Sequence, residues 1–355
     1  MGDFKWLHLS DLHFRECEGF DMNLIIDRLK TVLRKETEDQ GFRYIFLTGD
    51  LADRSDYSAV EPRIKELLLD SGIMEEGGRV FWACGNHDIP SRKKRIRKQV
   101  IEEIRDRKKT DKTFEYEFAD EESREVLLGV FDEYYKKRKS LFHMEAEEYP
   151  HQVIHTDDLE IVMLNTCLTS CDDEDEHKLY LREAGLIKLF HEIEPGKPVF
   201  VMGHHSLNYL ADADGGKLLS LFQEKNVSLY LCGHSHRLGV RPLSETMQEI
   251  VSGGFKEDGY AVISFFTGVY RESEGTYQLF PYTYRSGSMN WAIDYQAVSG
   301  MEEGKTYQAA LIRKGGEEEL SDLTIRCQKL FQEISNGKEA NIDRLNQIGE
   351  RRLRK

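Results

Sequence analysis

The stretch RVFWACGNHDIP, residues 79–90, decides the fold because it shows how a strand of this protein ends. Residues 80–84 are an apolar run of the length and composition of a buried strand. Gly85 follows, and then come an amide, an imidazole and a carboxylate, from Asn86, His87 and Asp88. One such tetrapeptide is a weak signal, so the ends of the other predicted strands determine what it means.

Similar apolar runs occur at residues 6–10, 44–48, 161–165, 198–202 and 228–232. Several of them are separated by helical patterns, and this alternation predicts an α/β fold with a largely parallel inner sheet. After residue 245 the pattern changes, since EIVSGG, YAVISFF, GVYRES and TYQLFPY follow one another with no helix between them. These runs predict antiparallel strands that finish a second sheet.

Two segments differ from this pattern. Residues 91–148 carry almost no strand signal and are rich in charge, which predicts a helical insertion over one edge of the core. From Glu317 onward, apolar residues recur on one helical face and a second helix follows a Ser-Asn-Gly stop. We therefore expect a main domain over residues 1–298 and an extension over 299–355 with a helical hairpin that binds a partner or self-associates.

Composition restricts the function classes. The 355 residues carry a formal net charge of −15, which argues against bulk attraction to a nucleic acid or an anionic membrane. A local exception is residues 92–109, with ten basic and three acidic residues. This segment is either an amphipathic helix with solvated charges or a track for a phosphate backbone. No apolar run is long enough to span a membrane and no signal-peptide region precedes the first strand, so we expect a cytoplasmic protein with no membrane partner.

Polar residues follow five of the predicted strands. They are Asp11 and His13, then Asp50 and Asp53, then Asn86, His87 and Asp88, then His204 and His205, and lastly His234 and His236. The carboxyl ends of strands in an open α/β sheet converge on one crevice, so these side chains are expected to be neighbours. Unpaired carboxylates are expensive to bury, which indicates that positive charge holds the group together.

Two divalent metal ions would supply that charge. Mixed nitrogen and oxygen ligands suit Mn, Fe, Zn, Co or Ni, and among these we expect manganese. A carboxylate shared by both ions holds them about 3.5–4 Å apart, the spacing that suits displacement at phosphorus.

The ordered series SDLH, GDLAD, GNHD, GHH and GHSH, which spans residues 10–236, resembles the signature of the calcineurin-like metallophosphoesterases. The resemblance implies a four-layer sandwich of two mixed sheets flanked by helices. It also implies roles for the motif residues. Asp11, His13 and His236 would bind one metal, Asn86, His204 and His234 the other, and Asp50 would bridge them. His87 would protonate the leaving oxygen and Asp53 would orient His87.

The resemblance is greatest to the phosphodiesterase and nuclease branch, because protein phosphatases of the family have GDxHG where this chain has SDLHF. We therefore expect a hydrolase that uses a metal-bridging hydroxide to cleave phosphodiesters, most readily those of nucleotides. His205 is a candidate substrate contact, and Arg54 either holds a phosphate oxygen or is an ordinary surface arginine. One alternative is a DNA or RNA nuclease guided by residues 92–109. Another is a partner-binding module with a vestigial site.

Overall fold

The computed structural model describes residues 2–15, 20–90, 94–106, 113–145, 150–171, 175–255 and 263–309. The chain divides into two units, Met1–Leu311 and Ile312–Lys355. The second unit, and with it the predicted C-terminal hairpin, lies outside the described residues. None of the described helices is both long and apolar enough to cross a bilayer.

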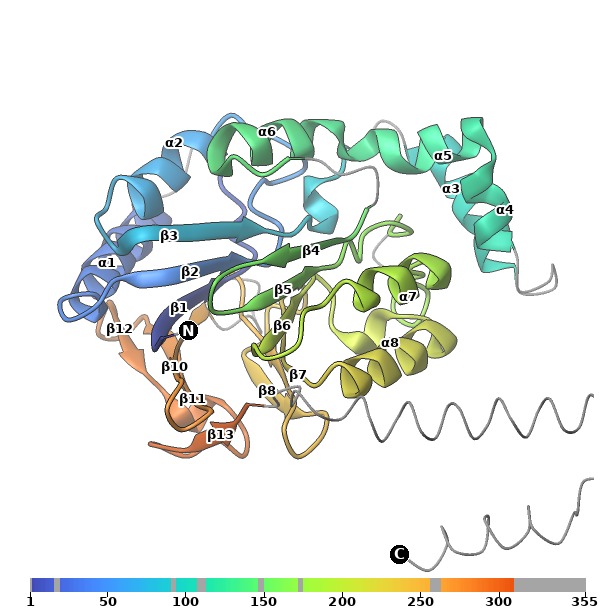
Figure 1. Cartoon of the computed structure of the whole chain (residues 1–355). Coiled ribbons are helices and arrows are strands. Elements are labelled where there is room, and N and C mark those ends of the chain that lie inside the picture. Colours follow the sequence, from blue (N-terminus) through green and yellow to red (C-terminus); the bar gives the residue numbers. More distant parts are fainter. Residues whose placement is uncertain are drawn as a thin grey trace, which may run out of the picture. The chain divides into compact units, whose positions relative to one another are not determined.

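The first unit contains two mixed β-sheets (Figure 1). One has the strand order β12-β11-β10-β1-β2-β3, with β13 paired to β11. Its strands are β1 (Phe4–Leu9), β2 (Phe42–Leu47), β3 (Met74–Trp82), β10 (Ser264–Arg271), β11 (Thr276–Arg285), β12 (Asn290–Ile293) and β13 (Thr306–Gln308). The pairs β1·β2 and β2·β3 are parallel, and β1·β10 is antiparallel.

The other sheet has the strand order β4-β5-β6-β7-β9-β8. Its strands are β4 (Gln152–His155), β5 (Glu160–Met163), β6 (Val199–Met202), β7 (Val227–Cys232), β8 (Gly239–Pro242) and β9 (Gln248–Val251). The four strands β5, β6, β7 and β9 run parallel, and the outer strands β4 and β8 are antiparallel to their neighbours. Both sheets are therefore mixed.

Successive side chains of a strand point to opposite faces of the sheet, and this alternation explains how the layers form. In β2, Tyr44 and Phe46 join a buried cluster that includes Phe200 and Met202 of β6, so this face packs against the other sheet. The alternate residue Ile45 joins a separate cluster with helices on the opposite face. Those helices are α1 (Phe20–Glu36), α2 (Val60–Ile64), the π-helix Lys65–Leu69 that continues α2, and α6 (Asp132–Phe142).

The second sheet is covered in the same way by α7 (Glu183–His191) and α8 (Asp212–Glu224). Phe190 of α7 and Phe222 of α8 have ring centroids 5.8 Å apart, and Phe222 lies 5.6 Å from Tyr230 of β7. Helices therefore cover the outer face of each sheet, and the two sheets pack against each other. This arrangement confirms the four-layer sandwich that the sequence resemblance implied.

The prediction for the segment after residue 245 is wrong in one respect. Only Gln248–Val251 joins the second sheet, and there it runs parallel to β7. The antiparallel strands β10, β11 and β12 extend the first sheet beyond β1 instead. The physical reason is the close fit of β10 to β1, where the Trp6 indole occupies the space that a Cβ at Gly268 would need, and this pairing places Phe266, Tyr270 and Leu279 between the two sheets.

The range predicted as an insertion contains α3 (Lys94–Arg105), α4 (Thr113–Ala119), α5 (Glu121–Leu128) and α6. Two arginines of α3 attach it to the core. The buried guanidinium of Arg97 donates to the carbonyl oxygens of Cys167, Leu168 and Ser170. Arg105 pairs with Asp175 at 2.6 Å and donates to the carbonyl of Thr169. These bonds fix the loop that follows β5.

Candidate metal centre

The strand ends of both sheets meet at one site, and hydrogen bonds between the loops hold them together. The amides of Asp11 and His13 donate to the carbonyls of Gly49 and Asp50 at 3.0 and 2.9 Å. The amide of His234, from the loop after β7, donates to Asp11 Oδ2 at 2.9 Å. The first, second and fifth motifs of the series therefore form one connected structure.

Five of the seven predicted metal ligands have a left-handed backbone, which is uncommon for residues other than glycine. They are Asp11 (φ 53°), His13 (φ 45°), Asp50 (φ 53°), His234 (φ 67°) and His236 (φ 53°). Strained conformations of this kind persist where the surrounding structure over-determines them, and they cluster at functional sites.

The first ligand set is Asp11, His13 and His236, whose ligand atoms lie within 4.8 Å of one another. His236 Nε2 is 3.2 Å from Asp11 Oδ1 and 3.4 Å from His13 Nε2. Burial alone would raise the pKa of Asp11, but the hydrogen bond from His236 and the nearby imidazoles lower it. The carboxylate is therefore charged and faces two imidazole nitrogens.

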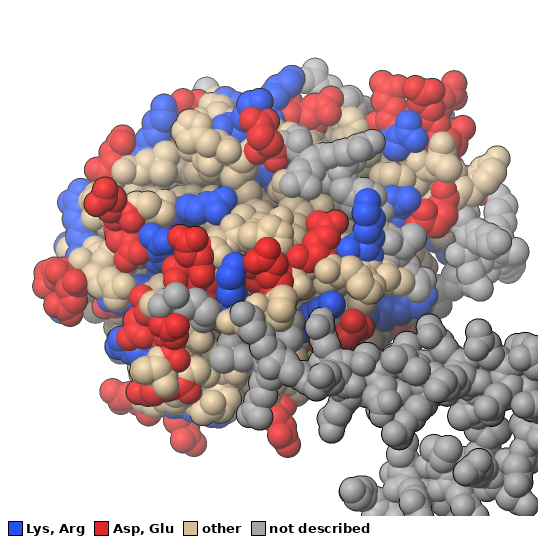
Figure 2. All heavy atoms as spheres, viewed as in Figure 1, with Lys and Arg blue, Asp and Glu red and all other residues tan. Residues whose placement is uncertain are grey.

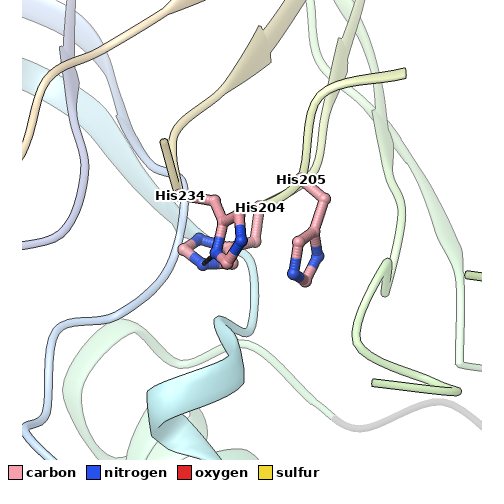
Figure 3. Close-up of side chains that lie close together, drawn as sticks. All are labelled: His204, His205 and His234. Carbon is pink, nitrogen blue, oxygen red and sulfur yellow. Dashed lines mark hydrogen bonds between the residues drawn. The ribbon is translucent and has the colours of Figure 1, made fainter. Parts of the chain in front are cut away.

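The second set is Asn86, His204 and His234. Asn86 Oδ1 lies 2.9 Å from both His204 Nε2 and His234 Nδ1, and these two nitrogens are 3.3 Å apart (Figure 3). His204 Nδ1 lies 2.8 Å from the carbonyl of Thr48, so it donates there and leaves Nε2 directed at the site. A backbone carbonyl thus fixes the orientation of this imidazole, with Nε2 facing Asn86 and His234.

Asp50 lies between the two sets. Its Oδ2 is 3.3 Å from His204 Nε2 and 3.9 Å from His13 Nε2, and its Oδ1 accepts the backbone amide of His87 at 2.7 Å. Burial lowers the pKa of His204, but the Asp50 carboxylate outweighs burial and raises that pKa well above 6.5. The negative charge of Asp50 therefore dominates the environment of this imidazole.

The four predicted catalytic residues have different surroundings. His87 is 34% exposed, and its Nδ1 lies 3.9 Å from Asp53 Oδ1, beyond hydrogen-bond distance. Asp53 forms a closer pair with Arg15, whose Nε is 2.9 Å from its Oδ2. Arg54 is exposed and, within the described part of the chain, forms no ion pair.

His205 is brought into the same cluster as His204 and His234 but is fully buried. Its Nδ1 contacts Thr166 Oγ1 at 3.0 Å, and burial together with the two neighbouring imidazoles holds its pKa well below 6.5. Its ring centroid is 4.3 Å from that of His234 and 4.8 Å from that of His204, so the three imidazoles labelled in Figure 3 form one cluster.

Sequence reasoning assigned no role to Asp88, which the structure places at the base of the site. Its buried carboxylate accepts the amides of Gly85 at 2.8 Å, Asp50 at 3.1 Å and Ala52 at 3.2 Å. Burial and the charge of Asp50 raise the pKa of Asp88 to about 7. Its position directly after His87 was the available signal, since a third polar residue at a strand end needs a partner.

A family model and known proteins resemble this chain. Residues 4–238, more than half of the chain, match the family model described as calcineurin-like phosphoesterase. An uncharacterised metallophosphoesterase-like protein from Bacillus subtilis, YydB, is 24% identical over 335 residues, which cover 90% of this chain and 67% of that protein.

Similar solved structures include a dimetal phosphatase from Danio rerio, at 13% identity and a TM-score of 0.46, covering 78% of this chain and 95% of that one. The purple acid phosphatase PPD1 from yellow lupin seeds is 12% identical, with a TM-score of 0.47 and coverage of 83% and 55%. The family match spans all five motifs of the site. The chain therefore belongs to the calcineurin-like phosphoesterase family, whose members are metal-dependent hydrolases of phosphoric esters.

Proposed function

We propose that the chain holds two divalent metal ions and hydrolyses phosphodiesters, with nucleotides as the substrate class. The observation that carries this proposal is the position of Asp50 Oδ2, which is 3.3 Å from His204 of one ligand set and 3.9 Å from His13 of the other. A carboxylate oxygen between two such sets suits a bridging ligand.

The donor set fits a pair of transition-metal ions. Imidazole nitrogens, carboxylate oxygens and one amide oxygen converge there, a mixture that favours Mn, Fe, Zn, Co or Ni over Ca or Mg. Manganese is the ion to test first. When bound, the ions supply Lewis-acid activation of water and neutralise charge on the phosphoryl oxygens.

The protein side chains supply the remaining steps. His87 is the exposed imidazole beside the predicted ligands, since its ring centroid is 4.8 Å from that of His13. We assign it protonation of the departing alkoxide. We assign orientation of His87 to Asp53, whose Oδ1 lies 3.9 Å from His87 Nδ1 and has to approach to hydrogen-bond distance for this role. Arg54 at the exposed rim pairs with a phosphate oxygen.

The contacts of α3 support a nucleotide more than a nucleic-acid strand. Arg97 and Arg105 belong to the basic segment 92–109, but both bind the loop after β5 and are not available to phosphates. On the face shown in Figure 2, acidic and basic side chains are interspersed. A phosphate-backbone track requires several basic side chains that face solvent together.

The test is hydrolysis of bis(4-nitrophenyl) phosphate by the full chain loaded with manganese. Asp50→Asn is expected to abolish turnover and to lower bound metal in elemental analysis of the dialysed protein. Asp120→Asn is the matched control, because Asp120 caps α5 on the surface and Asn caps equally well. If the Asp50→Asn variant kept full activity, the proposal that Asp50 bridges the two metal ions would be wrong.

The substrate class is tested separately with cyclic nucleotides, dinucleotides and single-stranded DNA at two salt concentrations. Nucleotide turnover with little dependence on salt is expected. Cleavage of DNA that falls steeply as salt rises would favour the nuclease instead.

A further inference from the structure

A tyrosine beside the candidate metal centre has no role in the proposed hydrolysis. Tyr209 lies at the end of the 3₁₀ helix η5 (Leu207–Tyr209), which begins two residues after His205. Its ring centroid is 4.6 Å from the His234 ring, at an interplanar angle of 90°, and 5.5 Å from the His205 ring. The aromatic ring therefore borders the second ligand set directly.

The helix that carries Tyr209 is fixed to the second sheet. The amide of Leu207 donates to Glu249 Oε1 at 2.9 Å, and Glu249 is only 2% exposed. Arg241 pairs with Glu249 Oε2 at 2.7 Å and also donates to Asn208 Oδ1 at 2.7 Å. A buried carboxylate and one arginine thus hold two successive residues of η5.

The backbone of Tyr209 itself is bound as well, since its carbonyl accepts the amide of Leu179 at 3.1 Å. Its side chain, by contrast, is partly exposed, and its hydroxyl forms no hydrogen bond within the described part of the chain. A tyrosine that only fills a core is usually buried with its hydroxyl paired. Here a rigid scaffold presents a partly open ring at the site.

The chain also places an exposed cation near the metal ligands in sequence, since Arg237 directly follows the predicted ligand His236.

From these observations we infer that Tyr209 forms the wall of a subsite for the organic group of the ester, and that this group contains a planar ring such as a nucleobase. The inference rests on the proposed function and names its substrate class more closely. Stacking of a base on an aromatic side chain is sequence-tolerant and changes affinity by about tenfold or more.

The test compares adenosine 5′-monophosphate with ribose 5-phosphate, which share the phosphate and sugar but differ in the base. Isothermal titration calorimetry of the manganese-loaded full chain gives the affinity for each ligand. Because both ligands carry the same phosphate, the contribution of the metals and the phosphate cancels in the ratio of the two affinities. We expect the wild-type protein to prefer the nucleotide by about tenfold or more. Tyr209→Leu should bring the ratio close to one, and Tyr209→Phe should keep it.

Tyr116→Leu is the matched control, because Tyr116 lies on α4 and is 73% exposed, and this change should leave the ratio as in wild type. Thermal unfolding of each variant shows whether it is folded. If Tyr209→Leu is not folded, the wild-type ratio and Tyr209→Phe decide, because a preference lost in Tyr209→Phe, which keeps the ring, would contradict stacking on that ring. A wild-type protein that binds both ligands equally, or neither, contradicts the subsite, as does an unchanged ratio in Tyr209→Leu.

The two proposals fail separately. Hydrolysis of phosphodiesters together with no preference for the nucleotide would overturn the subsite and leave the proposed function intact. A preference that depends on Tyr209, in a protein that hydrolyses no phosphodiester, would support the subsite and overturn the hydrolytic assignment.

Discussion

Replacing Asp88 by Asn tests how the site is built. The carboxylate accepts three buried backbone amides, two through Oδ2, from Gly85 and Asp50, and one through Oδ1, from Ala52. The Asn side chain keeps one oxygen, which can still accept the amides of Gly85 and Asp50. Its NH₂ group then faces the backbone amide of Ala52, and two donors cannot form a hydrogen bond with each other. One buried donor without a partner costs about 1–3 kcal/mol. We expect a loss of about 1–3 kcal/mol in the free energy of unfolding.

The assay is urea unfolding in the presence of EDTA, so that metal binding does not contribute. Trp82, buried at the end of β3, provides a fluorescence signal close to the substitution. Asp120→Asn is again the control and should change stability by less than about 0.5 kcal/mol, because Asn is an equivalent helix cap. Equal effects of Asp88→Asn and Asp120→Asn would refute the argument that the three amides depend on the Asp88 carboxylate.

Three further predictions follow from the site and its surroundings. His87→Ala should slow hydrolysis of alkyl esters more than nitrophenyl esters, which need no proton on the leaving oxygen, and equal losses in kcat would contradict the acid role. Gly85→Ala should weaken manganese binding in titrations, since the added Cβ would lie 2.1 Å from Asp50 Oδ1, while Gly216→Ala, with nothing within 4 Å, should not. Burial lowers the pKa of His151 to about 4, so its contribution of about 3 kcal/mol is complete above pH 6.5 and is lost as pH falls towards 4. Urea unfolding at pH values between 6.5 and 4 should show that the free energy of unfolding falls less steeply with pH in His151→Gln than in the wild-type protein. The same pH dependence in both proteins would contradict this role of His151.

The site could be predicted to a large extent because it depends on local signals. An apolar strand that ends in polar residues is visible in one short stretch. Gly and a polar residue follow β2, β3, β6 and β7, and Ser10 and Asp11 follow β1. The parallel arrangement then brings the strand ends to one place. Once those strands are assigned, the convergence of the ligand sets on Asp50 follows from topology.

The partners of β10–β12 could not be predicted, because neither length nor alternation states which sheet a hairpin extends. The apolar residues of β10 suit either sheet, and the choice is made by contacts far apart in the sequence, such as the pairing of Trp6 with Gly268. The space for a Cβ at Gly268 is taken by the Trp6 indole, 2.2 Å away, so close packing of two strands decides this pairing.

The basic segment shows why charge alone is a poor guide to function. Arg97 and Arg105 are eight residues apart on α3 and therefore share a face of the helix, yet sequence counts them simply as positive charge. Their partners are mostly backbone carbonyls of residues 167–170, which carry no signature in the sequence. This loop also supplies Thr166, whose hydroxyl accepts the backbone amides of both His204 and His205. Arginines of the insertion therefore support the candidate metal centre indirectly. Substituting Arg97 should therefore disturb metal binding without any change in contact with substrate.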